Sequence, residues 1–224
     1  MSDIHNAIMA LAARLPDGYR VLDVGCGLRP YEYLFSHGTY IGIDVSQSGR
    51  AEEGKKMDYE FDGINIPFSA EDFDFVLCTQ VLEHATEPEK LLNEIERVLK
   101  KGGQLFLTVP FIWGVHELPY DFRRYTDIGI QTALKAAGLE IIKAEKLTKG
   151  IDAIKMIVSS ETNNYIENVI DKKQKDSWKF RFILRTQGYL LKVLYYIWRR
   201  NLQFERIYID NLVVAEKAIT ASSK

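Results

Sequence analysis

Two carboxylates and two glycines near the start of the chain are spaced for binding a nucleotide. Asp23 lies two residues before Gly25, Gly27 follows, and Asp44 ends the next apolar run. Glycine in a turn lets the backbone lie against a ligand, because no Cβ separates them. A carboxylate at the end of the neighbouring strand is suited to accept both hydroxyls of a ribose. These four residues therefore predict a nucleotide-like ligand.

A second group of reactive side chains falls within residues 111–126, a density that is unusual for a simple connection. Its members are His116, Asp121, Arg123, Arg124 and Tyr125. His116 is the best candidate for a general base, since an unperturbed imidazole has a pKa of about 6.5. Two structural alternatives stay open, a surface histidine or one bonded to Asp121 to hold the loop. The arginines and Asp121 either bind an anionic or sugar ligand or form an ion pair that fixes the loop.

Alternating strands and helices are expected to position both groups. The predicted strands are 20–24, 40–44, 56–61, 73–78, 104–109, 139–147 and 207–215. The predicted helices are 4–15, 31–35, 126–137 and one that starts at a capping box of Thr86 with Glu89 and is stopped by Gly102. This alternation predicts an α/β fold, a parallel sheet with helices on both faces.

Five separated motifs fall in one register along the chain. They are Asp23-Val24-Gly25-Cys26-Gly27 followed by Asp44, Asn65-Ile66-Pro67-Phe68, Phe73 to Cys78, Val81-Leu82-Glu83-His84, and Arg97 to Gly103. In this order they resemble the pattern of the type 11 family of class I S-adenosylmethionine (SAM) methyltransferases. The resemblance covers about residues 18–148. A dinucleotide fingerprint is incomplete, because Pro30 stands where the third glycine of G-x-G-x-x-G belongs.

The resemblance implies a Rossmann-like sheet of seven mostly parallel strands, with an antiparallel last strand, and SAM as the cofactor. The implied cofactor-binding residues are Asp23, Gly25, Gly27, Asp44, Asp62 and Gln80. Asp62 is favoured over Asp58 to meet the adenine amino group, because of its spacing before Ile66. Gln80 follows strand four and is expected near the sulfonium. No metal ligands are predicted.

Methyl transfer is an in-line displacement that requires an aligned acceptor and, for a hydroxyl, removal of its proton. Residues 111–126 follow strand five, where acceptor groups are expected. His116 and Asp121 are therefore the catalytic candidates, and Arg123, Arg124 and Tyr125 are the acceptor-binding candidates. The stretch also resembles the H-E-x-P-x-D-F-x-R-Y-T loop of type 11 methyltransferases associated with surface-polysaccharide synthesis.

These features predict an O-methyltransferase acting on a glycan, lipid-linked or small-molecule acceptor. The alternative is a SAM-binding regulatory or partner module without catalysis. An NAD-dependent oxidoreductase is disfavoured by Pro30 and by the downstream motifs.

The composition is that of an ordinary globular protein, with 46% hydrophobic and 27% charged residues and a net charge of −2. Such a balance argues against nucleic acid as a partner. The two cysteines, Cys26 and Cys78, indicate no disulfide scaffold and fit a reducing cytosol. Residues 1–16 lack the pattern of a signal peptide. We therefore expect a cytoplasmic protein with one methyltransferase domain over residues 1–224.

The predicted domain has its core at about 18–148 and 206–217, with an insert at 149–205. Within the insert, 150–164 is predicted as a loop and the chain from Tyr165 onward as helical. Three interpretations stay open: a helical hairpin on the body or against a second copy in a homodimer, an interfacial element, or a substrate lid. The interfacial interpretation predicts peripheral membrane contact through 178–200. The apolar run 190–198 is shorter than the ~20 residues of a membrane span.

Overall fold

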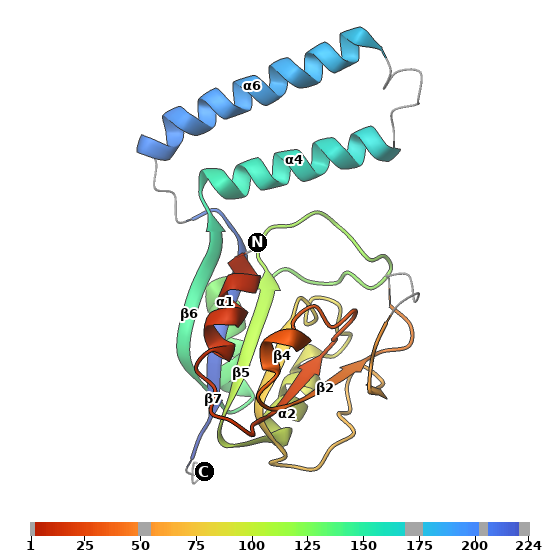
Figure 1. Cartoon of the computed structure of the whole chain (residues 1–224), viewed down its shortest axis with the longest axis vertical. Helices are drawn as coiled ribbons and strands as arrows, with labels where there is room; N and C mark the ends of the chain where they lie inside the picture. The colour runs from red at the N-terminus through yellow and green to blue at the C-terminus, as the bar shows by residue number, and fades with distance from the viewer. Residues whose placement is uncertain (1–2, 49–54, 169–176, 202–205, 220–224) are drawn as a thin grey trace. The chain divides into compact units, whose positions relative to one another are not determined.

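The computed structural model describes residues 3–48, 55–168, 177–201 and 206–219. The chain divides into two compact units (Figure 1). The first comprises residues 1–111, 115–147 and 210–224, and the second comprises residues 112–114 and 148–209.

A seven-stranded sheet in the order β3-β2-β1-β4-β5-β7-β6 forms the centre of the fold. Its strands are β1 (Arg20–Val24), β2 (Thr39–Asp44), β3 (Tyr59–Glu60), β4 (Phe73–Thr79), β5 (Leu99–Pro110), β6 (Leu139–Lys149) and β7 (Tyr208–Lys217). Strands β1 to β5 pair in parallel, and β7 pairs antiparallel with β5. The predicted Rossmann-like sheet with an antiparallel last strand is therefore confirmed.

Alternate residues of the central strands fill two separate hydrophobic cores. In β1, Leu22 and Val24 point into the core shared with helices α2 (Pro88–Val98) and α3 (Asp127–Ala136). Val21 points into the other core, with helix α1 (Asp3–Ala12) and the 3₁₀ helix η1 (Glu32–Phe35). Since side chains alternate across a strand, these cores mark the two faces of the sheet. Helices thus cover both faces, as predicted.

Three details differ from the sequence-based expectation. Strand β3 is only two residues long, and both Tyr59 and Glu60 are exposed. The predicted capping box is wrong, because Glu87 is the N-cap of α2 and no side chain caps the helix. That helix also ends at Val98, before Gly102, because Leu99 already adopts an extended conformation and begins β5.

The second unit is built from two helices, α4 (Ile151–Asn168) and α6 (Trp178–Asn201). The loop predicted for 150–164 is wrong: no proline or glycine lies between Ile151 and Asn168 to interrupt a helix. The helices contact each other where Lys155 Nζ lies 4.9 Å from the centre of the Tyr195 ring. Among the described residues, neither this unit nor the sheet unit contains a helix with the length and apolarity of a membrane span.

Candidate cofactor and acceptor site

The turn after β1 is fixed to the end of β2 by the backbone. Gly25 and Cys26 both donate their N–H groups to the carbonyl of Ile43, at 2.8 and 3.0 Å. Gly25 has a φ of +72°, and a Cβ at this position would lie 2.4 Å from Val81 Cγ2. A side chain at position 25 is therefore opposed both by the backbone conformation and by contact with Val81. The bare backbone that the sequence predicts at the carboxyl edge of the sheet is present.

Asp44 ends β2 with its carboxylate turned toward this glycine turn. Its Oδ2 accepts a hydrogen bond from Gly27 N at 2.8 Å, and its Oδ1 accepts one from Val45 N at 2.7 Å. Lys55 Nζ lies 3.6 Å from Oδ1. The structure therefore brings together the carboxylate and the turn that are predicted to hold a ribose.

Asp23 lies inside the protein, only 1% exposed. Its carboxylate accepts a hydrogen bond from the Tyr40 hydroxyl, while Oδ1 has no hydrogen-bond partner among the described residues. Burial raises the pKa of Asp23 to about 7, against the lowering effect of the Tyr40 hydrogen bond. The position indicates that Asp23 joins β1 to β2 behind the turn; its contact with the cofactor stays a prediction.

The two acids considered for adenine occupy different environments. Asp62 is exposed and accepts hydrogen bonds from the backbone of Ile64 and Asn65 and from the Asn65 side chain, which lower its pKa. Asp58 instead accepts from Gly42 N at 2.8 Å and pairs with Arg29 at 3.0 Å. Asp58 is thus tied to the sheet, whereas Asp62 organises the loop after β3. Neither contact tests the predicted role of Asp62.

Gln80 follows β4 with a φ of +56°. Its backbone N–H donates to Thr108 O at 3.0 Å, and its side-chain amide lies 3.2 Å from Thr108 Oγ1. A hydrogen bond from Gln80 also opposes the effect of burial, which raises the pKa of Asp210 to about 6. The side chain therefore links β4 to β5 and β7 at the carboxyl edge.

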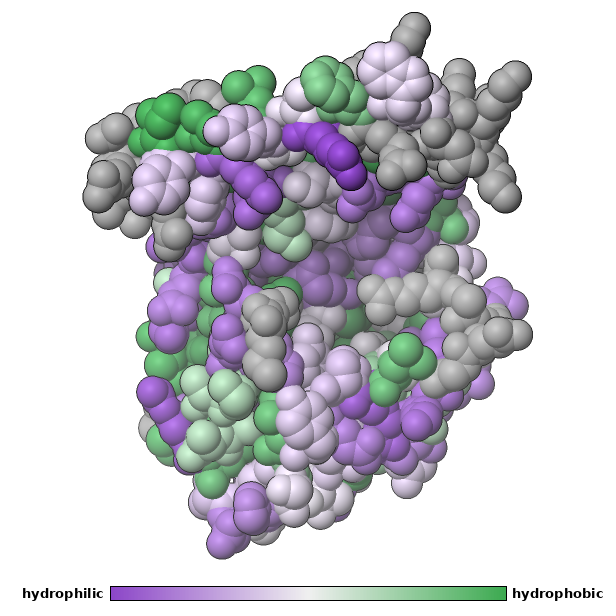
Figure 2. Space-filling model, turned by 45° about the horizontal axis from the view of Figure 1, so that its top comes forward, coloured by the Kyte–Doolittle hydropathy of each residue, from purple (hydrophilic) through white to green (hydrophobic). Residues whose placement is uncertain are grey.

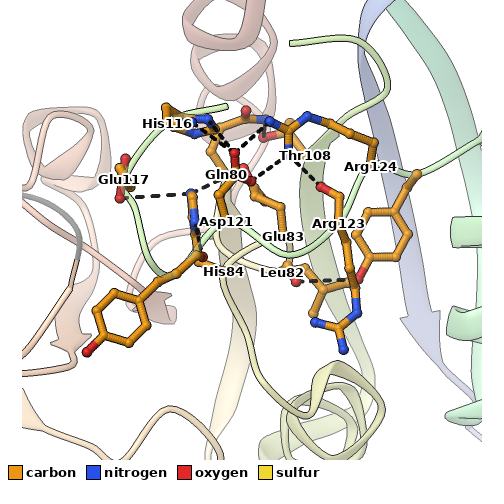
Figure 3. Close-up of polar contacts among 12 residues, drawn as sticks. Gln80, Leu82, Glu83, His84, Thr108, His116, Glu117, Asp121, Arg123 and Arg124 are labelled. Carbon is orange, nitrogen blue, oxygen red and sulfur yellow. Dashed lines mark hydrogen bonds and ion pairs between the residues drawn. The ribbon is translucent and has the colours of Figure 1, made fainter. Parts of the chain in front are cut away.

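Asp121 organises the stretch that carries the predicted catalytic residues (Figure 3). Its carboxylate accepts two hydrogen bonds from the Arg124 guanidinium, at 2.6 and 2.8 Å, and one from His116 N at 2.9 Å. These contacts hold its pKa well below the usual range, with the Arg124 hydrogen bonds as the largest cause. Asp121 also lies 3.3 Å from His116 Nδ1, so it orients the imidazole.

The other predicted acceptor-binding residues hold the same stretch against the β4 side of the fold. Arg123 donates to the carbonyls of Ala85 and Thr86, and the Tyr125 hydroxyl donates to Leu82 O at 3.3 Å. The structure therefore gives Arg123, Arg124 and Tyr125 loop-holding contacts, and their roles in acceptor binding stay predictions.

Glu83 and His84 are not among the site residues predicted from the sequence. The Glu83 side chain is fully buried, which raises its pKa to about 8. His84 Nδ1 lies 2.7 Å from Tyr120 O, and the His84 ring packs edge-on against His116 with 4.9 Å between ring centres. The signal in the sequence that could have identified them is a carboxylate next to a histidine, just after a buried strand.

A cavity of about 510 Å³ lies elsewhere, between α1 and the sheet. Its lining includes Leu11, Phe75, Phe106 and Leu212, and none of the predicted site residues. The predicted site residues lie instead at the carboxyl edge of the sheet, with the turn, Asp44 and the 111–126 stretch.

A glycine turn facing a strand-end carboxylate, at the carboxyl edge of this sheet, is the arrangement of a Rossmann-like nucleotide-binding fold. A family model described as "Methyltransferase domain", of type 11, matches residues 22–107. An uncharacterised protein of Methanocaldococcus jannaschii is 31% identical over 169 residues, which is 69% of this chain and 80% of that protein. The ubiquinone biosynthesis O-methyltransferase of Dechloromonas aromatica is 38% identical over 108 residues. That match spans 41% of this chain and 44% of the enzyme, less than half of either.

Among solved structures, phosphoethanolamine N-methyltransferase 2 of Haemonchus contortus in complex with SAM superposes with a TM-score of 0.57. The two are 20% identical, and the match covers 96% of this chain and 52% of that one, so it shows the fold alone. Over residues 22–107 the chain carries a methyltransferase domain of the class I SAM-dependent type, with SAM as its cofactor. Within that class it carries the type 11 methyltransferase domain.

Proposed function

We propose that the protein transfers the methyl group of SAM to a hydroxyl oxygen of a glycan, lipid-linked or small-molecule acceptor. The observation that carries the cofactor half of this proposal is the hydrogen bond from Gly27 N to Asp44 Oδ2. It supports a ribose site in which the Asp44 carboxylate gives up hydrogen bonds within the protein and accepts hydrogen bonds from the two ribose hydroxyls instead. Gly25 and Gly27 supply the bare backbone, Asp62 meets the adenine, and Gln80 lies toward the sulfonium.

The acceptor half is supported by the side chains at the ends of β4 and β5. His116 is oriented by Asp121, an arrangement suited to removing a proton from a bound hydroxyl. The ubiquinone biosynthesis relatives are O-methyltransferases by name, which favours oxygen as the acceptor atom. The resemblance of residues 116–126 to the surface-polysaccharide loop favours a sugar or lipid-linked sugar.

Incubation with methyl-labelled SAM and a panel of glycans, lipid-linked sugars, small hydroxyl compounds and RNA tests this function. We expect label on a hydroxyl-bearing member, located by mass spectrometry. SAM binding in calorimetry without transfer to any member would favour the alternative, a SAM-binding module without catalysis. Label on nitrogen would contradict the assignment of the acceptor atom.

The helical unit supports a second part of the proposal, peripheral contact with an anionic membrane. Helix α6 carries exposed aromatic residues at helical spacing, and exposed cations lie in the same register. The stripe consists of Trp178, Phe182, Arg185, Tyr189, Lys192, Val193 and Tyr196. Figure 2 shows green apolar side chains beside pale and purple ones on this unit. Aromatic and basic residues on one helix face suit the interface of an anionic bilayer.

A further inference from the structure

Glu83, His84 and His116 bring one carboxylate and two imidazoles together at the carboxyl edge of the sheet. One potential ligand atom from each residue lies within 4.8 Å of those of the other two. Glu83 and His84 follow β4, whereas His116 belongs to the stretch after β5. Residues from two separate parts of the chain therefore converge on one point.

The Glu83 carboxylate is buried at this cluster without a hydrogen bond to compensate it in the described part of the chain. The side chain is 0% exposed, and neither carboxylate oxygen makes a hydrogen bond among the described residues. A buried carboxylate in this state is costly unless a proton or a cation compensates it. Its closest ion-pair partner, His84 Nε2, lies at 3.8 Å, beyond hydrogen-bond distance.

The hydrogen bond of His84 determines which ring nitrogen presents its lone pair to the cluster. Tyr120 O, 2.7 Å from Nδ1, only accepts hydrogen bonds, so the proton of a neutral ring lies on Nδ1. Nε2 then presents its lone pair, 3.8 Å from Glu83 Oε1 and 3.8 Å from Glu117 Oε2. It is buried without a hydrogen-bond partner among the described residues. A lone pair facing two carboxylates suits a cation placed between them (Figure 3).

His116 shows the outer contact that metal-ligating histidines commonly have. Its Nδ1 lies 3.3 Å from Asp121 Oδ2, and Asp121 is in turn held by Arg124. A carboxylate on one ring nitrogen orients the imidazole and raises the basicity of the other. The two histidines are thus anchored from outside, one by a backbone carbonyl and one by a carboxylate.

The charges around the cluster also favour a cation. The carboxylates of Glu83, Glu117 and Asp121 lie near these histidines, and Arg124 is bound to Asp121 by both of its terminal nitrogens. Glu83 Oε1 and Glu117 Oε2 each lie 3.8 Å from His84 Nε2. A dipositive ion would balance both carboxylates.

We propose that Glu83, His84 and His116 bind one divalent transition-metal ion, of the Zn²⁺ or Mn²⁺ type. Two imidazoles and one carboxylate leave coordination positions open for water or a hydroxyl ligand, as in catalytic zinc sites. Bound in this way, His116 is a ligand and is no longer available as a free general base. The inference concerns metal binding and does not depend on the identity of the methyl acceptor.

The test uses the full chain, stripped with a chelator and dialysed, and titrated with Zn²⁺ alone by calorimetry. We expect one equivalent to bind and the midpoint of thermal unfolding to rise. Co²⁺ should give a visible absorption spectrum that Zn²⁺ abolishes. His116→Ala should weaken binding at least ~10-fold, since loss of even an outer contact costs this much.

Two further variants keep the test decisive. His37→Ala removes a histidine that is 78% exposed and distant from the cluster, and it should bind the ion like the parent chain. Glu83→Gln should abolish the cobalt spectrum; circular dichroism and calorimetry with SAM report whether this variant is folded. Binding unchanged in both His116→Ala and folded Glu83→Gln, or absent from the parent at millimolar Zn²⁺, would overturn the proposal. Intact SAM binding in any of these cases leaves the proposed function standing.

Discussion

Gly27 donates its backbone N–H to Asp44 Oδ2 across 2.8 Å and so joins the turn after β1 to the carboxylate that ends β2. This contact is made between parts of the chain that lie 17 residues apart. Asp44 is only 7% exposed, so a ligand has to replace existing partners of its carboxylate in order to bind there. A ribose with two adjacent hydroxyls offers the two donors that such a carboxylate needs.

Replacing Asp44 by alanine is expected to weaken SAM binding by about 2 kcal/mol or more, or roughly 30-fold, because a charge-assisted bidentate contact is lost. Calorimetry with SAM measures the change. Asp72→Ala is the matched control, since Asp72 pairs with Arg20 at the opposite edge of the sheet. Equal affinities of the Asp44 variant and the parent would remove the ribose assignment.

Gly25→Ala is expected to destabilise the protein by about 1–3 kcal/mol and to abolish SAM binding. Both the positive φ and the contact with Val81 Cγ2 oppose a Cβ there. Adding Val81→Ala should restore part of the stability, because it removes the contact and leaves only the strain. Gly27→Ala, which meets nothing within 4 Å, should cost only the strain of about 1–2 kcal/mol. Urea unfolding checks this order; equal losses for Gly25→Ala and Gly27→Ala would contradict it.

The pH dependence of stability should reflect Asp23. Its pKa is about 7 in the folded chain and lies near 3.8 when unfolded. Between these values the folded state retains a proton that the unfolded state releases, so stability falls as pH rises from about 4 to 7 and then levels off.

Asp23→Asn should make this decline shallower by up to about 1 kcal/mol per pH unit. Urea unfolding of both proteins at pH 5, 6 and 7.5 provides the measurement. Glu83 and Asp210, whose pKa values are also raised, act in the same direction and remain in the variant. Parallel pH profiles of parent and variant would show that Asp23 titrates normally.

His116→Ala should slow methyl transfer by ~10²-fold or more with SAM affinity intact if the imidazole takes the acceptor proton. Single-turnover transfer of labelled methyl, with and without chelator, separates its two roles. A free base acts equally well in metal-free protein, whereas a metal ligand loses its importance once the ion is removed. Rates within a few-fold of the parent in both conditions would leave His116 with a structural role.

Reversal of two exposed cations on α6, Arg185→Glu with Lys192→Glu, should reduce binding to anionic vesicles by at least ~10-fold, since each basic residue near such a surface contributes about 1 kcal/mol. Co-sedimentation with phosphatidylserine and phosphatidylcholine vesicles measures this. Lys101→Glu, on the exposed start of β5, is the control. Equal sedimentation of the double variant and the parent would argue against the membrane interpretation.

The sheet and the glycine turn could be predicted because their signals are local. Buried strands such as Phe73–Thr79 are short apolar runs, and Gly25 stands where the backbone has to take a positive φ. Helix α4 was not predicted because its polar residues resemble a loop, while its helical state depends on uninterrupted backbone hydrogen bonds and packing against α6. Pattern alone does not weigh these tertiary contacts.

The cluster of Glu83, His84 and His116 could not be predicted for a different reason. His116 is separated from His84 by the whole of α2 and β5, and its position depends on the path of the stretch that Asp121 and Arg124 hold. Spacing along the chain gives no measure of such a path. By contrast, Asp44 reaches Gly27 because neighbouring parallel strands end at the same edge, which topology guarantees.

Strands β6 and β7 are neighbours in the sheet, and Gly150 N donates to Ile207 O at 2.7 Å where the chain leaves one and returns to the other. Helices α4 and α6 lie between these two points of the chain, so a short hairpin could replace them without breaking the sheet. A related chain that lacks both helices should therefore still form the same seven-stranded sheet.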